Sequence, residues 1–305
     1  MSAYAPRTTI SVTPRDEAET QMGDSRRSPT VRRRRLGIEL RKLREAAEMS
    51  ALDVTRSLEW SPGKVTRLEK AQAVKPMVVD TRLLLDLYGV PKDDPRYEEL
   101  VTLTREARQR GWWISYKDVL DDPYAEFEAG AEKIHTYELA NIPGLLQTPA
   151  YAAAVYRGAL IRESVEIERR VQLRMERQAI LHADNPPYLW AVIDEAAILR
   201  PFGTAEDRRE QLQHLIATER LEHVTVQVLP MEVGPHPGMT GPFVILDFPD
   251  NDPSLVYIET HPNSLYLEER EEIQRYSVVF QNLLAMALSP DATIAHLSRL
   301  IDQLK

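Results

Sequence analysis

The sequence predicts a multidomain protein with an all-α domain of five helices over residues 30–110 and an α+β domain with a largely antiparallel sheet over residues 111–305. Apolar residues recur at helical spacing through the first region. In the second region, short β-rich segments and turn residues alternate with helical patterns. The two regions also differ in charge, since residues 26–75 hold 14 Lys and Arg against 6 Asp and Glu, whereas residues 111–305 hold 16 against 30. The basic segment therefore predicts an anionic partner for the first domain alone.

The composition excludes several classes of site. The 305 residues include no cysteine, which removes disulfides, thiolate zinc sites and cysteine nucleophiles. No apolar run approaches the ~18 residues that span a bilayer, and no apolar segment follows the N-terminal arginines as in a secretory signal. We therefore expect a cytoplasmic protein without a membrane partner. Residues 1–29 are rich in Pro, Ser and Thr without periodicity, which predicts a disordered tail.

Each of the five helices in the first domain has a start signal, an apolar stripe or both. The first helix has Thr30 as its cap and the apolar stripe of Leu36, Leu40, Leu43 and Ala47. Ser50 and Asp53 form a capping box for a second helix through Leu58, and Ser61-Pro62 opens a third helix to about Ala71. The fourth helix has the stripe of Val79, Leu83, Leu84 and Leu87, and Asp94-Pro95 opens a fifth helix that ends near Gly111.

The second and third of these helices indicate a helix-turn-helix unit, because only Glu59 and Trp60 separate them. In such a unit the second helix lies in the major groove with its N-terminal residues at the base edges. Val65 and Leu68 face inward, which leaves four residues for the open face: Gly63, Lys64, Thr66 and Arg67. Lys64 and Arg67 can donate to guanine O6 and N7, and Thr66 can contact a base edge or a thymine methyl.

Basic residues around this unit are expected to contact phosphate without reading sequence. The candidates for phosphate contact are Arg33 and Arg34, within the basic run Arg32–Arg35, together with Arg41 and Lys75. The alternative reading is that these charges form the solvated face of an ordinary helical bundle.

Residues 36–76 resemble the helix-turn-helix domain of the XRE family, whose fold is similar to that of lambda repressor. The resemblance implies an ion pair between Glu69 and Arg44, and it places Ser50, Ala51 and Ser61 near phosphate or bases. The turn glycine of many members is Glu59 here, and the glycine after the third helix is Ala71. Because a glycine there often has a positive φ, these two residues leave the turn geometry open. Trp60 is either a wedge against the core or an exposed contact.

The second domain is predicted from alternating strand and helix patterns. The expected strands are 134–139, 188–194, 224–229, 243–248 and 255–260, and the expected helices are 149–158, 164–183, 204–220, 268–288 and 291–304. Residues 231–242 are expected to be a long hairpin connection, with a flap over a pocket as the alternative.

The segments 134–155, 168–181, 188–203, 224–230 and 238–248 resemble the C-terminal domain of WhiJ-like actinobacterial regulators. The resemblance implies an antitoxin-like transcriptional regulator whose C-terminal domain binds a small protein encoded by an adjacent gene. Candidate partner contacts are Leu145, Leu146, Gln147 and Tyr151, unless Leu145 and Leu146 dock onto their own core. The other hypothesis is a regulator with a metabolite in this domain. XRE-like heads usually read two half-sites, so we expect a homodimer on an inverted repeat of double-stranded DNA.

No residue pattern in the second domain predicts catalysis, a metal or a cofactor. The seven histidines show no metal-ligand spacing. Asp194 and Glu195 follow a predicted strand, where neighbouring side chains point to opposite faces, so capping is the favoured role over an acid/base pair. We therefore expect a protein that is not an enzyme.

Overall fold

The computed structural model describes residues 28–304 apart from 74, 110, 117, 121, 250–251 and 261–263. The predicted tail over residues 1–29 therefore lies outside the described residues except at its end. There, Ser28 is the N-cap and Pro29 the first residue of helix α2 (Pro29–Ala46), so the helix begins before the predicted cap Thr30. Proline suits this position because the first N–H groups of a helix have no intrahelical acceptor.

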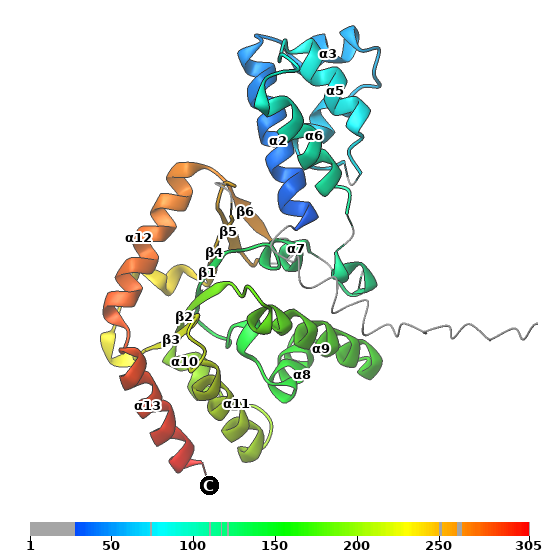
Figure 1. Cartoon of the computed structure of the whole chain (residues 1–305). Helices are drawn as coiled ribbons and strands as arrows, with labels where there is room; N and C mark the ends of the chain where they lie inside the picture. The colour runs from blue at the N-terminus through cyan, green and yellow to red at the C-terminus, as the bar shows by residue number, and fades with distance from the viewer. Residues whose placement is uncertain are drawn as a thin grey trace, which may run out of the picture.

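The N-terminal head is helical throughout its regular elements, at the top of the molecule in Figure 1. After α2 come α3 (Ala51–Ser57), α4 (Lys64–Glu69), α5 (Val78–Leu87) and α6 (Pro95–Glu106). Their buried side chains form one core that includes Leu36, Leu40, Val54, Val65, Leu68, Leu84, Leu85 and Val101. The helix α2 passes so close to the end of α4 that a Cβ on Gly37 would lie 2.4 Å from the Glu69 carbonyl oxygen. Only glycine therefore fits at position 37.

The apolar stripe predicted for α5 is partly wrong. Val79 and Leu83 are exposed, at 53% and 41%, whereas Leu84 and Leu85 are fully buried. The inward face also carries two polar contacts. Asp80 forms an ion pair with Lys64, and the hydroxyls of Thr81 and Thr104 form a hydrogen bond of 2.8 Å. The buried face of α5 therefore consists of Asp80, Thr81, Leu84 and Leu85, which differs from the face that apolar spacing alone predicts.

The C-terminal domain is built on a six-stranded sheet with the order β3-β2-β1-β4-β5-β6. The strands are β1 (Lys133–Glu138), β2 (Tyr188–Asp194), β3 (Val224–Leu229), β4 (Phe243–Asp247), β5 (Leu255–Ile258) and β6 (Leu265–Leu267). β1 pairs with β2, and β2 with β3, in parallel, while the pairs β1–β4, β4–β5 and β5–β6 are antiparallel. The α+β class holds, and the sheet is mixed, with three antiparallel and two parallel strand pairs, so the prediction of a largely antiparallel sheet fits only in part.

Helical crossovers explain the parallel half of the sheet. The chain passes from β1 to β2 through α8 (Pro149–Gly158) and α9 (Ser164–Gln178), and from β2 to β3 through α10 (Glu195–Leu199) and α11 (Ala205–Thr218). A connection of this kind returns the chain to the same end of the sheet, so the next strand runs parallel to the last.

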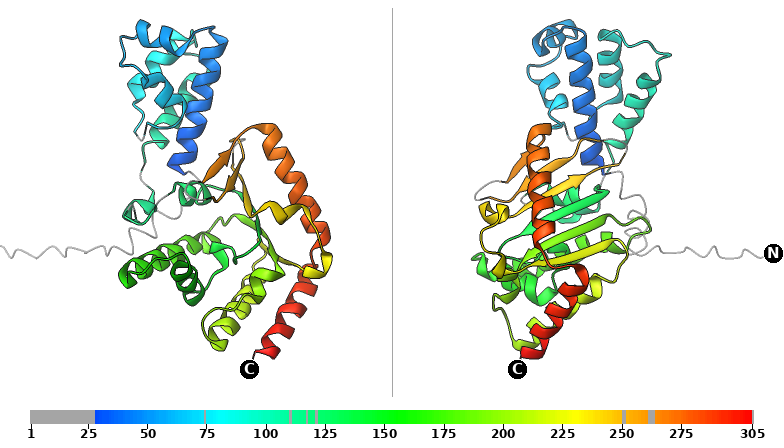
Figure 2. Two further views of the ribbon diagram at one scale, coloured as in Figure 1. Left: turned by 180° about the vertical axis from the view of Figure 1, so that it is seen from behind. Right: turned by 90° about the vertical axis from the view of Figure 1, so that its left-hand side faces the viewer.

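Helices cover both faces of the sheet (Figure 2). On one face, α8, α9 and α11 pack over a large core, and α13 (Pro290–Gln303) lies against α11 and β3. On the other face, α12 (Arg270–Met286) packs Phe280 and Leu283 onto the strands. Short helical turns complete the connections, namely η1 (Trp112–Tyr116), α7 (Tyr124–Glu128), η2 (Gly144–Leu146), η3 (Ala179–His182), η4 (Met231–Val233) and η5 (Pro237–Thr240).

Residues 231–242 do not form the predicted hairpin connection, because β3 and β4 are not neighbours in the sheet. The segment instead passes from the β3 edge to the strand beside β1. On the way Gly238 packs on Tyr137, and a Cβ at this glycine would lie 2.5 Å from the ring.

Within the described part of the chain, no single helix has the length and apolar character needed to cross a bilayer. The pair α12 and α13 passes that test only together, across a break at which the two helices bend by 64°.

Candidate nucleic-acid interface

The turn between α3 and α4 is longer than predicted. α4 begins at Lys64 instead of Pro62, because Gly63 is the N-cap with φ of 79° and cannot belong to the helix. Ser61 is therefore not the cap. It lies in the exposed turn, where its carbonyl accepts a hydrogen bond of 3.2 Å from the Lys64 N–H. α4 has six residues and follows directly on this exposed turn.

Two non-glycine residues adopt the left-handed conformation around α4. Glu59, at the end of α3, has φ of 52°, and Ala71, after α4, has φ of 55°. The positive φ that a glycine would adopt without strain thus occurs at two residues that carry a side chain. A left-handed backbone at a residue with a Cβ costs about 1–2 kcal/mol, so both positions are strained.

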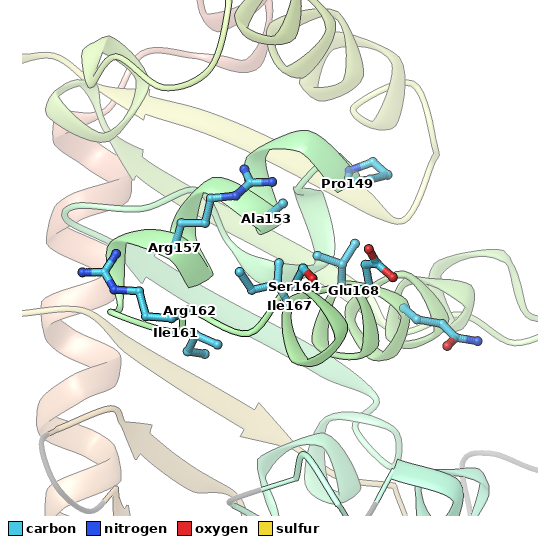
Figure 3. A pocket seen from close by; sticks show the side chains of 10 residues that line it. Pro149, Ala153, Arg157, Ile161, Arg162, Ser164, Ile167 and Glu168 are labelled. Atoms are coloured by element: carbon cyan, nitrogen blue, oxygen red, sulfur yellow. The ribbon is translucent and has the colours of Figure 1, made fainter.

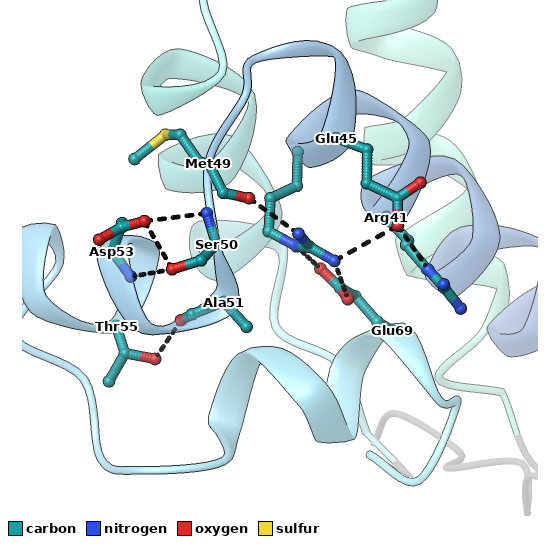
Figure 4. A network of polar contacts seen from close by, with 9 residues as sticks. Arg41, Glu45, Met49, Ser50, Ala51, Asp53, Thr55 and Glu69 are labelled. Atoms are coloured by element: carbon teal, nitrogen blue, oxygen red, sulfur yellow. Dashed lines mark hydrogen bonds and ion pairs between the residues drawn. The ribbon is translucent and has the colours of Figure 1, made fainter.

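Arg44, near the end of α2, binds Glu69 of α4 and Met49, which precedes the N-cap of α3; Figure 4 labels both partners. Its Nε and Nη2 donate to the two carboxylate oxygens of Glu69 at 2.6 and 3.0 Å, and its Nη1 donates to the Met49 carbonyl at 2.8 Å. The hydrogen bond to Glu69 raises the pKa of Arg44 despite partial burial. This is the pair implied by the resemblance, and its bidentate geometry fixes the angle of α4 against α2.

Ser50 and Ala51 begin α3 as a structural cap. The Ser50 hydroxyl accepts the Asp53 N–H at 3.1 Å, and the Asp53 carboxylate accepts the Ser50 N–H at 3.0 Å. The same carboxylate also accepts the Ser50 hydroxyl at 2.5 Å. Ser50 is exposed at the start of the helix, while Ala51 is half-buried and its carbonyl accepts the Thr55 hydroxyl. A phosphate reaching Ser50 would have to share its hydroxyl with Asp53.

The two cations predicted to read bases, Lys64 and Arg67, have different surroundings in the structure. The Lys64 ammonium lies 2.7 Å from a carboxylate oxygen of Asp80 and 3.9 Å from the centre of the Trp60 ring. Trp60 itself packs against the head core, as the wedge reading predicts, and so forms a platform for Lys64. Nothing in the sequence pairs Lys64 with Asp80, because they lie 16 residues apart on different helices.

Arg67 is the exposed cation of α4. Among the described residues no carboxylate pairs with its guanidinium, whose hydrogen bond goes to the Pro62 carbonyl at 3.5 Å. Thr66 is half-buried beside it, and Gly63 is exposed. An exposed guanidinium that has no carboxylate partner among the described residues can donate bidentately to guanine. Arg67 is therefore the side chain best placed to read a base.

The predicted phosphate contacts Arg33 and Arg34 instead join the two domains, which corrects that expectation. Figure 1 shows the first turns of α2 reaching the C-terminal domain near α7 and the β5–β6 end of the sheet. There, Arg33 lies 3.4 Å from a carboxylate oxygen of Glu126, with a further hydrogen bond of 2.5 Å to the Thr30 hydroxyl. Arg34 lies 2.6 Å from Glu268.

Arg34 is buried between the two domains. Besides Glu268 it donates to the carbonyl of Pro253 and, at 3.0 Å, to that of Ser254, and its guanidinium lies 5.9 Å from the Phe248 ring centre. Its side chain is 6% exposed. Burial lowers the pKa of Arg34, an effect that Glu268 opposes. No phosphate can reach this guanidinium while the domains stay docked.

The neighbouring arginines extend the same contact. Arg32 and Arg35 both pair with the buried Asp252 of the β4–β5 connection, at 3.5 and 3.2 Å, and they also pair with Glu106 and Glu99 of α6. We call Arg32–Arg35 and these acidic partners the interdomain arginine cluster. Of the remaining phosphate candidates, Arg41 is exposed in an i,i+4 pair with Glu45, and Lys75 is exposed.

The candidate partner contacts of the C-terminal domain are buried, which corrects their assignment to a docking surface. Leu145, Leu146, Gln147 and Tyr151 are each at most 4% exposed. The Tyr151 hydroxyl accepts the Ile142 N–H at 3.0 Å, and Gln147 donates to the Ile142 carbonyl at 2.6 Å. These side chains therefore belong to the interior of their own domain, which is the alternative stated for Leu145 and Leu146.

Acidic and histidine side chains elsewhere have structural contacts. Asp194 caps α10 by accepting the Ala196 N–H at 2.9 Å, and Glu195 accepts the Met231 N–H at the same distance. In the part of the chain that the structure describes, which leaves out His261, no three His, Asp or Glu side chains are placed to hold a metal ion.

The pair α3 and α4, clamped to α2 and presenting Arg67 outward, defines a helix-turn-helix DNA-binding protein. Comparison with family models agrees: the model described as "Helix-turn-helix domain" matches residues 35–97. The model described as "Domain of unknown function (DUF5753)" matches residues 122–299, more than half of the chain, and the protein belongs to that family. Neither the curated proteins nor the solved structures compared with the chain gave a match.

Proposed function

We propose that the protein is a sequence-specific transcriptional regulator that binds an inverted-repeat operator as a cytoplasmic homodimer. The observation that carries the proposal is the exposed guanidinium of Arg67, which no carboxylate of the described residues pairs with, on a helix that the Arg44–Glu69 pair fixes in place. Two such heads would read half-sites about 34 Å apart, one helical turn of DNA. The proposal assigns the chain no catalytic activity and no cofactor.

The experiment is a titration of the protein with DNA from its own promoter, followed by fluorescence anisotropy. Arg67→Ala should weaken specific binding by about 1–3 kcal/mol per head if the contact is bidentate to guanine. Lys64→Ala should cost less, since Lys64 is held by Asp80 and Trp60. Arg275→Ala, an exposed arginine on α12, is the matched control. Equal affinities of the Arg67 variant and this control would overturn the proposal.

We further propose that the C-terminal domain binds a small protein encoded by an adjacent gene, in an antitoxin-like arrangement. The WhiJ-like resemblance and the acidity of residues 111–305, with 30 acidic and 16 basic residues, support this. Because Leu145, Leu146, Gln147 and Tyr151 are buried, the contact must lie on other surfaces of the domain. Co-expression with the adjacent short reading frames and co-purification of the full chain tests the proposal, and a neighbour that never co-elutes at micromolar concentration contradicts it.

A ligand-responsive regulator is the second candidate function. A single observation favours it, which is a groove on the C-terminal domain of a size that suits a small molecule.

A further inference from the structure

The helices α8 and α9 enclose a groove of about 620 Å³ on the surface of the C-terminal domain (Figure 3). Pockets that bind small molecules have volumes of roughly 300–1,000 Å³. The groove lies next to the buried side chains of Leu145, Leu146, Gln147 and Tyr151, since the exposed Pro149 between them contributes to its wall. Its other lining residues are Ala153, Arg157, Ile161, Arg162, Ser164, Ile167, Glu168, Val171 and Gln172.

The floor of the groove is apolar. Ile167 is buried at 7% exposure, and Ala153, Ile161 and Val171 are half-buried around it. Such a surface gains about 25 cal/mol for each Å² of apolar area that a ligand covers. The floor therefore favours the hydrocarbon part of a ligand.

The charges at the mouth are unequally placed. Arg157 and Arg162 lie toward one end, and Glu168 lies toward the other (Figure 3). Within the described chain, neither arginine has a carboxylate partner.

Three arginines of the neighbouring helix α9 have carboxylate partners. Arg169 pairs with Asp118 at 3.4 Å, Arg170 with Glu166 at 2.9 Å, and Arg177 with Glu128 at 2.8 Å. In a domain with an excess of acidic residues, Arg157 and Arg162 thus place two guanidinium groups, without a carboxylate partner among the described residues, at one end of the groove.

We infer that this groove binds a small amphipathic anion, a carboxylate with an aliphatic or aromatic body. The body would cover Ile161, Ile167 and Val171, and the carboxylate would accept hydrogen bonds from Arg157 and Arg162. Glu168 at the opposite end disfavours a second negative group there, so the ligand carries its charge at one end only. The inference concerns the groove alone and stands independently of DNA binding.

Calorimetric titration of the full chain with decanoate, 1-decanol and decylamine, each below its aggregation concentration, tests the inference without DNA. These probes share one hydrocarbon chain and differ in the head group. Decanoate should bind saturably and at least tenfold more tightly than decanol, since hydrogen bonds to a charged group contribute roughly 1.5–3 kcal/mol. Binding should also shift the methyl resonances of Ile161, Ile167 and Val171.

Three variants locate the site. The double variant Arg157→Ala, Arg162→Ala should lose the preference for decanoate over decanol, whereas Arg275→Ala should keep it. Ala153→Trp should fill the groove and abolish binding of both probes, with circular dichroism as the check on folding. The inference is overturned if decanoate does not bind, if decanol binds equally well, or if the double variant keeps the preference.

Discussion

The substitution Arg34→Ala should separate the two domains. Arg34 makes hydrogen bonds to Glu268 and to the carbonyl oxygens of Pro253 and Ser254. A buried acceptor left without its donor costs about 1–3 kcal/mol. Glu268 is about half exposed, at 46%, and can be solvated again, so it adds little. Because water enters part of the space left by the side chain, we expect a loss of about 2–4 kcal/mol of interdomain stability.

Urea denaturation and amide hydrogen exchange measure this loss. In the variant, exchange should accelerate at the start of α2 and around residues 252–258, while the core of α3 and α4 stays protected. Arg34→Lys should recover only part of the loss, because one ammonium cannot donate in the fork geometry of a guanidinium. Arg41→Ala, which removes an exposed i,i+4 pair, should have a much smaller effect. If Arg34→Ala behaves like Arg41→Ala, the cluster does not hold the domains together.

Three further outcomes follow from local geometry. Ala71→Gly should stabilise the head by about 0.5–1 kcal/mol in thermal unfolding. The strain energy relieved at the left-handed φ exceeds the entropic cost of a more flexible unfolded chain. As a control, Ala46→Gly, within α2, should destabilise the head. Burial raises the pKa of Glu138 to about 8. The folded chain then binds a proton that the unfolded chain releases near pH 4.5, so stability should fall as pH rises from 5 to 8, and Glu138→Gln should flatten that slope. Asp80→Asn should release Lys64, so that a subsequent Lys64→Ala lowers DNA affinity more than in the parent, as a double-mutant cycle would measure.

Elements with strong local signals were predictable from the sequence. β2 and β3 have the predicted bounds, and α8 begins at the Pro that follows its cap Thr148. Strand pairing was not predictable, since alternation of residues within a strand says nothing about which strand lies beside it. β6, with three residues, is too short to show a period.

The candidate site divides in the same way. Residues near one another in the helix-turn-helix motif, such as the Ser50–Asp53 box, follow from spacing. The Arg44–Glu69 pair was reached by resemblance to a family. Arg32 meets Asp252 across 220 positions of sequence, and no local pattern indicates such a contact. The excess of basic residues in this segment was counted correctly, but four of them, Arg32–Arg35, pair with the protein's own C-terminal domain.

This reassignment changes what the basic segment predicts about salt. Affinity for duplex DNA falls with salt at a logarithmic slope of about 0.9 for each phosphate neutralised. Lys75 is exposed, so Lys75→Gln should reduce the slope by about 0.9 per head if it touches phosphate. Arg33 is engaged by Glu126 and Thr30, and Arg33→Gln should leave the slope unchanged.

Anisotropy titrations over a series of salt concentrations would measure both slopes on the same operator. An Arg33 variant that lowers the slope as much as the Lys75 variant would mean that the head leaves the C-terminal domain when it binds DNA. In that case the acidic residues Glu126, Asp252 and Glu268 compete with phosphate for the same arginines. An unchanged slope would instead mean that the domains bind DNA while docked, and that the cluster sets the orientation of the head.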